Sequence, residues 1–428
     1  MTSLARRLGA VALIFYGIGD ILGAGIYALV GKVVTLAGPG AWITFLLAAV
    51  AAILTAMSYA ELTSRFPVNA GAAAYVARAF GGKLLPTLAG VFVLGSGLVS
   101  AATVTVAFSG YLKELLPVPD FVAKLFLTTG LSFLSFWGIA ASSRFNMLLT
   151  TVEAAGLLAV IGVGFSNSSA EAFLNWMSSS LHTAEWGGIF AGVTVAFYAY
   201  IGFEDLSNLA EEAKRPERDL PRAILTAIVV STVIYLFVTL ALQLNVSQAE
   251  IHRSETPLLL VFQKAGIEAW LKYFALVALL AITNTGLTNL IMASRLIYGL
   301  SREKFIPSIF STVHPRLKTP WVGILTAYLA LLLLVFTGGL KALAQTTSLL
   351  ILVVFIMVHA SLLLVKWRKQ RHEGIQFPWI FPCLGLITCL TFVFYFPWEV
   401  YLRSLIWLAL ALLLWFFSQK LRFKSRSR

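Results

Sequence analysis

Long apolar runs separated by short polar connections dominate this sequence. An α-helix needs about 18 or more mostly apolar residues to cross the ~30 Å hydrocarbon core of a bilayer. Twelve windows of the sequence meet that requirement. They cover approximately residues 8–31, 40–62, 85–111, 121–141, 145–165, 187–209, 222–243, 270–298, 320–337, 342–365, 379–397 and 400–418. Because little chain is left for a soluble domain, we predict an all-α integral membrane protein with twelve transmembrane helices.

The composition agrees with a membrane location. Apolar residues make up 59% of the chain and charged residues 12%, and the mean hydropathy is +0.86. If the N-terminus lies inside, most of the 32 Lys and Arg fall in the inner loops and at the two ends, as the positive-inside rule requires. We therefore predict a multi-pass protein of the cell membrane, embedded in the lipid bilayer, with both termini in the cytoplasm. The net charge of +13 then needs no nucleic acid partner.

The first window is interrupted by residues that suit a membrane helix poorly. The stretch GDILGAGIYALVGK, residues 19–32, contains four glycines and an aspartate. In hydrocarbon, a glycine-rich interruption persists only where the freed backbone groups face protein, water or a ligand. At Gly23, Ala24 and Gly25 a ligand can approach the backbone closely, and a half-helix beginning near Ile26 offers unpaired N–H groups to a carboxylate. The alternative is a packing face of small residues.

A second interruption lies in the sixth window. There Gly202 is followed by the acidic pair Glu204 and Asp205 before the helix re-forms. The two breaks, at about positions 24 and 201, head two groups of five windows, which is the pattern of an inverted-repeat secondary transporter. We expect a first repeat at 1–165, a second repeat at 166–366, and two further helices with a basic tail at 367–428.

Four stretches of the sequence resemble one family. They are GIGDILGAGIY in the first window, SYAELTSRFPVNAGAAAYV at the end of the second, AFYAYIGFEDLSNLAEEAKRPERDLPRAI in the sixth, and ASRLIYGLSREKFIPSIFSTVHPRLKTPW in the eighth and its loop. Together they are similar to the amino acid-polyamine-organocation (APC) superfamily of permeases. The resemblance implies the 5+5 inverted-repeat fold first known from a bacterial leucine transporter, with discontinuous helices 1 and 6 and two C-terminal helices. It also implies secondary active transport of amino acids by alternating access.

The resemblance further implies a substrate site at the two breaks. The substrate carboxylate would meet backbone N–H groups around Gly23, Ala24 and Gly25, ahead of Ile26. The substrate amino group would meet carbonyls freed near Tyr198, Ala199 and Ile201, beside Gly202. N–H groups suit an anion and exposed carbonyls suit an ammonium, so an α-amino acid satisfies both ends. The residues expected to wall or gate the side-chain pocket are Ile21, Phe197, Tyr198 and Tyr200.

Two embedded acids are the candidates for coupling transport to protons. Glu153 lies in the fifth window with no charge within eight residues on either side, and burial in hydrocarbon favours its protonated form. Several proton-coupled relatives look to have a lysine there, so Glu153 departs from the family pattern. It could carry a proton, help to bind sodium, or act as a neutral group in an exchanger or uniporter. Asp20, just before the first break, could share that proton, pair with a cationic substrate, or form a gate contact.

Other classes of protein fit the sequence less well. An enzyme needs a convergent catalytic set, and no histidines and carboxylates stand at metal-ligand spacing, so we expect neither an enzyme nor a metal cofactor. A channel needs a repeated filter loop or rings of charge, which these windows lack. A transporter-like nutrient sensor and a polyamine transporter remain alternatives. The particular substrate and the oligomeric state are left open.

Overall fold

The computed structural model describes residues 8–67, 71–137, 143–210, 213–302, 306–315, 317, 319–369 and 372–426, and in that part of the chain every regular element is a helix. The elements are α1 (Ala10–Leu22), α2 (Ala24–Ala37), η1 (Gly38–Gly40), α3 (Ala41–Arg65), α4 (Gly71–Phe80), α5 (Leu84–Lys113), α6 (Asp120–Trp137), α7 (Ser143–Ser166), α8 (Ala170–Thr183), α9 (Trp186–Ala196), η3 (Phe197–Tyr200), η4 (Phe203–Leu209), α10 (Pro216–Asn245), α11 (Gln248–Arg253), α12 (Pro257–Lys264), α13 (Ala269–Arg302), η5 (Ser308–Ser311), α14 (Trp321–Leu334), α15 (Leu340–Trp367), α16 (Ile380–Val393) and α17 (Trp398–Arg426).

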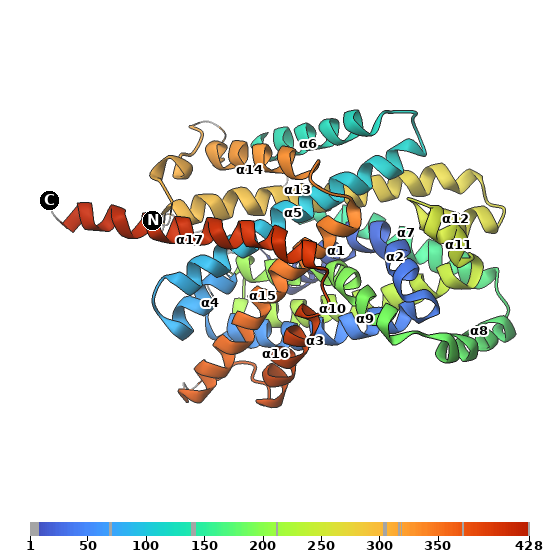
Figure 1. Ribbon diagram of the computed structural model, residues 1–428, viewed down its shortest axis with the longest axis horizontal. Coiled ribbons are helices and arrows are strands. Elements are labelled where there is room, and N and C mark those ends of the chain that lie inside the picture. The colour runs from blue at the N-terminus through green and yellow to red at the C-terminus, as the bar shows by residue number, and fades with distance from the viewer. Residues whose placement is uncertain are drawn as a thin grey trace.

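The long helices run along the long axis of the molecule (Figure 1). Both ends of the described chain lie at the left of that view, near α4, and we call this the terminal end. The short helices α8, α11 and α12 lie at the opposite end, which we call the far end.

Each of the twelve predicted windows overlaps helical structure, although the lengths vary. Eight helical stretches of the described chain are long and apolar enough to cross a membrane. One of them, Ala10–Arg65, runs for 56 residues, which at 1.5 Å per residue is far longer than one crossing requires. The apolar helices α14 and α16 are shorter, with 14 residues each. The prediction of an all-helical membrane protein is therefore confirmed, while the count of twelve crossings stays a prediction.

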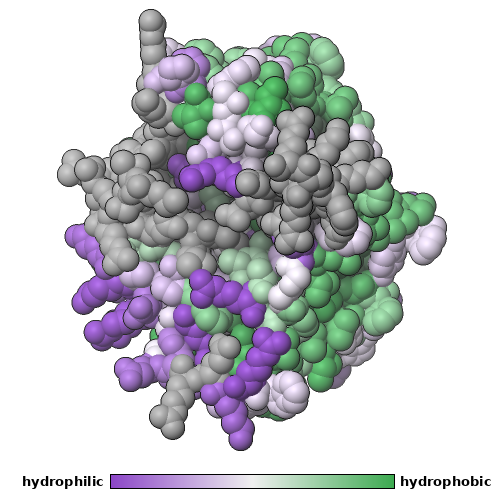
Figure 2. All heavy atoms as spheres, turned by 90° about the vertical axis from the view of Figure 1, so that its left-hand side faces the viewer, coloured by the Kyte–Doolittle hydropathy of each residue, from purple (hydrophilic) through white to green (hydrophobic). Residues whose placement is uncertain are grey.

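The outer surface of the bundle is apolar, as a lipid-facing surface must be. Leu333 on α14 is 71% exposed, and Phe394, which follows α16, is 80% exposed. Seen from the terminal end, hydrophilic side chains gather on the left and lower part of the face, and hydrophobic side chains cover the right-hand flank (Figure 2). A soluble protein rarely leaves so many large apolar side chains in water.

The helix is broken at both predicted places. Gly23, with φ −44° and ψ −139°, separates α1 from α2. In the sixth window, α9 tightens into η3, Ile201 is extended, and Gly202 has φ +129°, which only glycine adopts readily. The chain then continues as η4. Each break leaves backbone groups without the partners that a continuous helix would supply.

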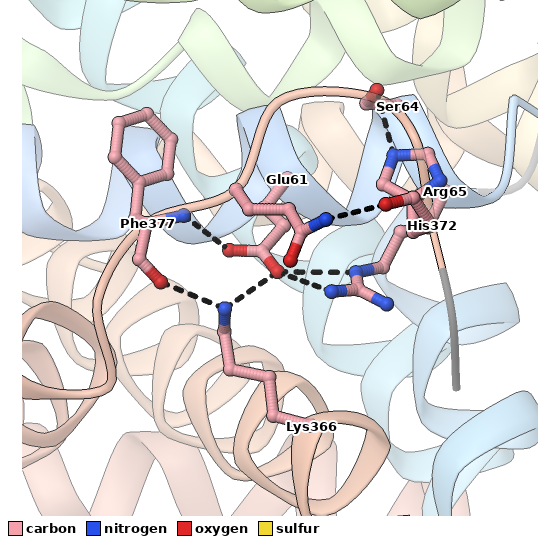
Figure 3. Close-up of polar contacts among 7 residues, drawn as sticks. Glu61, Ser64, Arg65, Lys366, His372 and Phe377 are labelled. Carbon is pink, nitrogen blue, oxygen red and sulfur yellow. Dashed lines mark hydrogen bonds and ion pairs between the residues drawn. The ribbon is translucent and has the colours of Figure 1, made fainter. Parts of the chain in front are cut away.

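The connection between α15 and α16 is fixed to α3 by buried charges (Figure 3). The fully buried Glu61 carboxylate accepts from Arg65 Nη2 at 2.7 Å, from Lys366 Nζ at 2.6 Å and from the Phe377 N–H at 2.9 Å. Lys366 also donates to the Phe377 carbonyl at 2.8 Å. Nearby, burial and then the charge of Arg65 lower the pKa of His372, whose Nε2 lies 3.0 Å from Ser64 Oγ. This cluster attaches the α15–α16 connection to the end of α3.

Removing the central carboxylate should destabilise the protein strongly. Glu61→Gln removes the buried negative charge that pairs with Arg65 and Lys366, and breaking a buried ion pair in this way costs about 3–5 kcal/mol. A thermal melt of the purified protein in detergent should show a clearly lower Tm for this variant. Glu255→Gln, at a carboxylate 66% exposed, is the matched control and should leave Tm unchanged. Equal Tm values for wild type and Glu61→Gln would show that the cluster does not stabilise the fold.

Candidate functional site

A cavity of about 1130 Å³ runs from the two breaks to the terminal end. Its inner part is lined by residues of α1, α2, η3 and η4 at the breaks, and by α5 and α13 opposite them. It is also lined by Arg78 of α4 and by Arg295 and Arg302 of α13. A typical small-molecule pocket measures roughly 300–1,000 Å³. The volume is therefore large enough to hold a small-molecule ligand.

The two breaks touch each other at the inner end of this cavity. A Cβ atom on Gly25 would lie 2.5 Å from the Cα of Ala199 in η3, so only glycine allows α2 to approach that closely. At Gly23 the space that a Cβ would need is already filled by the Thr285 hydroxyl. Packing of small residues and exposure of backbone were alternatives from the sequence; the contacts at Gly23 and Gly25 show the packing, and exposure of the backbone to a ligand stays a prediction. The N-terminus of α2 and η3 are therefore in direct contact.

The cavity reaches some of the predicted binding residues and not others. The predicted residues that line it are Asp20, Ile21, Gly25, Tyr198, Ile201 and Gly202. Those that do not appear in its lining are Gly23, Ile26, Phe197, Ala199 and Tyr200. Among the latter, Phe197 packs edge-on against Phe355, and the Tyr200 hydroxyl donates to the Phe45 carbonyl at 3.1 Å. Ala24 opens α2, and its side chain lies outside the described residues.

Three polar side chains, one each from η3, α5 and α13, are joined by hydrogen bonds in the cavity wall. The hydroxyls of Tyr198 on η3 and Ser100 on α5 are 2.8 Å apart, and the Asn289 amide of α13 donates to Ser100 Oγ at 2.9 Å. All three residues line the cavity. Ser96 and Thr285, which are polar residues of the third and eighth windows, also line it. This wall offers hydroxyl and amide groups to whatever side chain a ligand projects toward it.

Glu153 lies outside the cavity, buried between helices. It is 1% exposed, and its Oε1 accepts from the Asn284 amide of α13 at 3.2 Å. Its Oε2 is buried and has no partner in the described chain. The Tyr27 hydroxyl of α2 donates to the Glu153 carbonyl at 2.7 Å, and Tyr111 of α5 donates to the Tyr27 carbonyl at 2.8 Å. The backbone of α7 at Glu153 is thus hydrogen-bonded to α2, the helix that begins at the first break.

Comparison with known proteins identifies the family. A family model described as amino acid permease matches residues 8–418. The chain belongs to the amino acid permease family. It is 28% identical to a branched-chain amino acid permease of Bacillus subtilis (strain 168), over 97% of this chain and 93% of that protein. It is 29% identical to a methylthioribose transporter of the same organism, over the same shares. It is 30% identical to cationic amino acid transporter 4 of Mus musculus, over 90% of this chain and 62% of that protein. The resemblance to APC permeases is confirmed.

One residue of the permease site was missed by sequence reasoning. The Tyr235 hydroxyl of α10 contacts the Ile21 carbonyl at the end of α1 and donates to the Ala199 carbonyl of η3 at 2.8 Å. One hydroxyl proton cannot be donated to both carbonyls at once, so Tyr235 holds the two breaks together and leaves one carbonyl available as an acceptor. The signal in the sequence is a tyrosine in the middle of an otherwise apolar run, since a hydroxyl at that depth needs a partner.

Removing this hydroxyl should weaken substrate binding. Tyr235→Phe leaves the buried Ala199 carbonyl without its donor, at a cost of about 1–3 kcal/mol, and it loosens the contact between the breaks. The Kd for the transported amino acid should rise about tenfold, as measured by calorimetry on purified permease. Tyr401→Phe removes a hydroxyl that donates to the Val393 carbonyl away from the cavity, and it should leave the Kd unchanged. An unaltered Kd in Tyr235→Phe would argue against the role given to Tyr235.

On the far side of the breaks, small residues let α9 pack tightly against α2, η1 and α3. A Cβ on Gly188 of α9 would collide with the Leu36 carbonyl of α2, and one on Gly192 would lie 3.0 Å from Thr44 of α3. A Cβ on Gly40 would lie 2.8 Å from Ile189. These glycines bring α9 against α2 and α3 with no room for a passage between them.

Proposed function

We propose that this permease is a secondary active transporter that moves an amino acid across the cell membrane by alternating access. One observation carries the proposal: the two helix breaks meet at Gly25 and Ala199, beside a cavity that is lined by residues of both breaks. The N-terminus of α2 suits a carboxylate, and the carbonyls freed around Ile201 suit an ammonium. An α-amino acid carries both groups.

The proposal includes twelve crossings in a 5+5 inverted repeat followed by two helices. The strongest support is the pairing of helices. In that arrangement the first to fourth crossings would correspond to the sixth to ninth. The structure packs α2 against α9, α3 against α10, α5 against α13, and α6 against α14. Corresponding helices in contact are expected for two repeats related by an axis in the membrane plane. The two repeats would occupy residues 1–165 and 166–366, and residues 367–428 would form the two additional helices and the tail.

Alternating access requires a second state that is open at the far end. The glycine-mediated contacts of α9 with α2 and α3 are the ones that would separate in that state, while the cavity mouth at α4 and α13 would close. We assign the terminal end to the cytoplasm, because both ends of the described chain lie there (Figure 1) and the basic loops are expected inside. The structure then corresponds to the inward-open state.

We further propose that Glu153 carries the coupling proton. Its carboxyl is buried beside the first break, receives one hydrogen bond from Asn284, and has one oxygen without a partner in the described chain. The titratable groups that face it are Asp20 of α1, Tyr27 of α2 and Tyr235 of α10, and none of them is a cation. With no counter-charge, the neutral acid is the favoured form, and a change of packing against α1 can release its proton.

Uptake into proteoliposomes tests the proposal. Purified permease should accumulate at least one labelled amino acid above its outside concentration when a proton gradient is imposed, and it should exchange that amino acid without a gradient. Empty liposomes are the control. If none of the twenty amino acids binds to the protein or is taken up, the proposed function is wrong.

A further inference from the structure

An aromatic side chain of α15 contacts the chain on both sides of the second break. The centroid of the Phe355 ring lies 6.0 Å from that of Phe197 in η3 and 5.4 Å from that of Phe203 in η4. All three side chains are at most 1% exposed. Because Ile201 is extended and Gly202 has a positive φ, the helical hydrogen-bond ladder is interrupted between η3 and η4. The angle between these two segments therefore depends on the side chains that pack across the break.

Tyr59 of α3 takes part in the same packing. Its ring lies 5.6 Å from that of Phe355 and 5.8 Å from that of Phe203, edge-on in both cases. Edge-to-face ring pairs at such separations are favourable beyond the area that they bury. Tyr59 lines the cavity, whereas Phe355 does not. Phe355 can therefore influence a ligand in the cavity only through the residues that it contacts.

One turn further along α15, His359 attaches that helix to α3. Thr55 Oγ1 donates its proton to the Ala51 carbonyl at 2.8 Å, so it accepts from His359 Nε2, which is 3.1 Å away. His359 Nδ1 then accepts from Ser58 Oγ at 2.9 Å. Both ring nitrogens of this fully buried side chain are satisfied in one neutral tautomer. These two bonds fix the rotation of α15 about its axis, and with it the direction of Phe355.

The imidazole of His359 is also confined by α16. A Cβ on Gly385 would lie 2.2 Å from His359 Cε1, so only glycine leaves room for the ring there. Cys389, one turn later on α16, is fully buried, and its Sγ lies 3.9 Å from Thr55 Oγ1. His359 therefore joins α3, α15 and α16, which lie together in the bundle (Figure 1).

We propose that Phe355 is a positioning residue of the substrate site, which sets the angle between η3 and η4, and that His359 holds Phe355 in place. This inference rests on the proposed function, because the angle matters for transport only if the carbonyls freed around Ile201 bind the substrate. Without the Phe355 ring, the two segments can rotate relative to each other. The carbonyls then leave the position that the substrate ammonium requires, and a small displacement of this kind is costly.

Hydrogen exchange of the backbone tests the packing without any ligand. In Phe355→Leu, the amides of residues 197–209 should exchange about tenfold faster than in wild type, because two ring contacts across the break are lost. Phe262→Leu makes the same change at a fully buried ring that packs against Phe274 at 5.0 Å and does not line the cavity. It is the matched control and should leave exchange in 197–209 unchanged. Melting curves of both variants show whether their stabilities are comparable.

Binding of an amino acid tests the consequence for the substrate site. The probe is the one of the twenty amino acids that raises the Tm of the purified wild-type chain most, and its Kd is measured by calorimetry. Phe355→Leu should raise this Kd about tenfold, and Phe262→Leu should leave it unchanged. Phe203→Leu should also raise it. The double variant Phe203→Leu/Phe355→Leu should bind about as well as the weaker single variant, because both changes remove one shared contact.

Variants of His359 test how Phe355 is held. His359→Leu removes both hydrogen bonds to α3 and should raise the Kd in the same direction as Phe355→Leu. His359→Gln keeps a donor and an acceptor and should restore part of the affinity. Equal Kd values for wild type and His359→Leu would show that His359 does not position Phe355.

The outcomes separate this inference from the function beneath it. If Phe355→Leu exchanges or binds like Phe262→Leu, Phe355 does not position the substrate site, while amino acid transport stands. If Phe355→Leu fails to fold, as judged by its melting curve, the same two measurements on Phe355→Met decide. If no amino acid binds to wild type at all, the proposed function is overturned and this inference with it.

Discussion

Replacing Gly25 by leucine is expected to abolish amino acid uptake while the permease still inserts into the membrane. The reason is the contact between the breaks: even a Cβ at this position would lie 2.5 Å from the Ala199 backbone. A leucine side chain must push α2 away from η3, which costs about 1–3 kcal/mol in overpacking. It also separates the N–H groups from the carbonyls that are proposed to bind the two ends of the substrate. A displacement of about 1 Å in such a site lowers activity by roughly 100-fold.

Uptake of labelled substrate into proteoliposomes measures this effect, and Gly162→Leu is the matched control. Gly162 lies in α7, and nothing lies within 4 Å of the position that its Cβ would take. The control should therefore transport normally. Gly25→Ala adds only the Cβ and should show an intermediate loss. Normal uptake by Gly25→Leu would mean that the contact between the breaks is not part of the substrate site.

Glu153→Gln is expected to abolish the stimulation of uptake by an inward proton gradient. Glutamine has nearly the same shape and can keep the contact with Asn284 on α13, but it cannot bind or release a proton between pH 5 and 8. Substrate binding and exchange without a gradient should persist, because Glu153 does not line the cavity. The measurement compares initial uptake rates with and without the gradient.

The control for this experiment is Glu171→Gln, which removes an exposed acid from α8. It should respond to the gradient like wild type. Full stimulation in Glu153→Gln would exclude Glu153 as the proton carrier and would return attention to Asp20 and Glu204 in the cavity. Loss of both exchange and stimulation would instead assign Glu153 a structural role.

The positions of the breaks were predictable because they violate the pattern around them. Glycines and acids inside long apolar runs are costly, so Gly23 and Gly202 stand out without any knowledge of the fold. Glu153 stands out for the same reason. The membrane helices were predictable from the length of their apolar runs, and the structure has helices at every one of those windows.

Which side of each helix is buried in the bundle was not predictable. A helix that is apolar on all sides gives no periodic signal for its buried face. For this reason the sequence did not predict that Tyr235 lies at the breaks. It also did not predict that Glu61 binds the α15–α16 connection. Phe197 and Tyr200 lie in the predicted segment, yet they pack against Phe355 and Phe45 rather than line the cavity. The short helices α4 and α8 lie between windows, where hydropathy gives little information.

A density map of the permease with a saturating bound amino acid tests the central claim most directly. The claim predicts that α2 still begins at Ala24, that the substrate carboxylate lies against the N–H groups at Gly25, and that the ammonium lies against the carbonyls around Ile201. A substrate bound elsewhere in the cavity, or helices running unbroken through both positions, would contradict it.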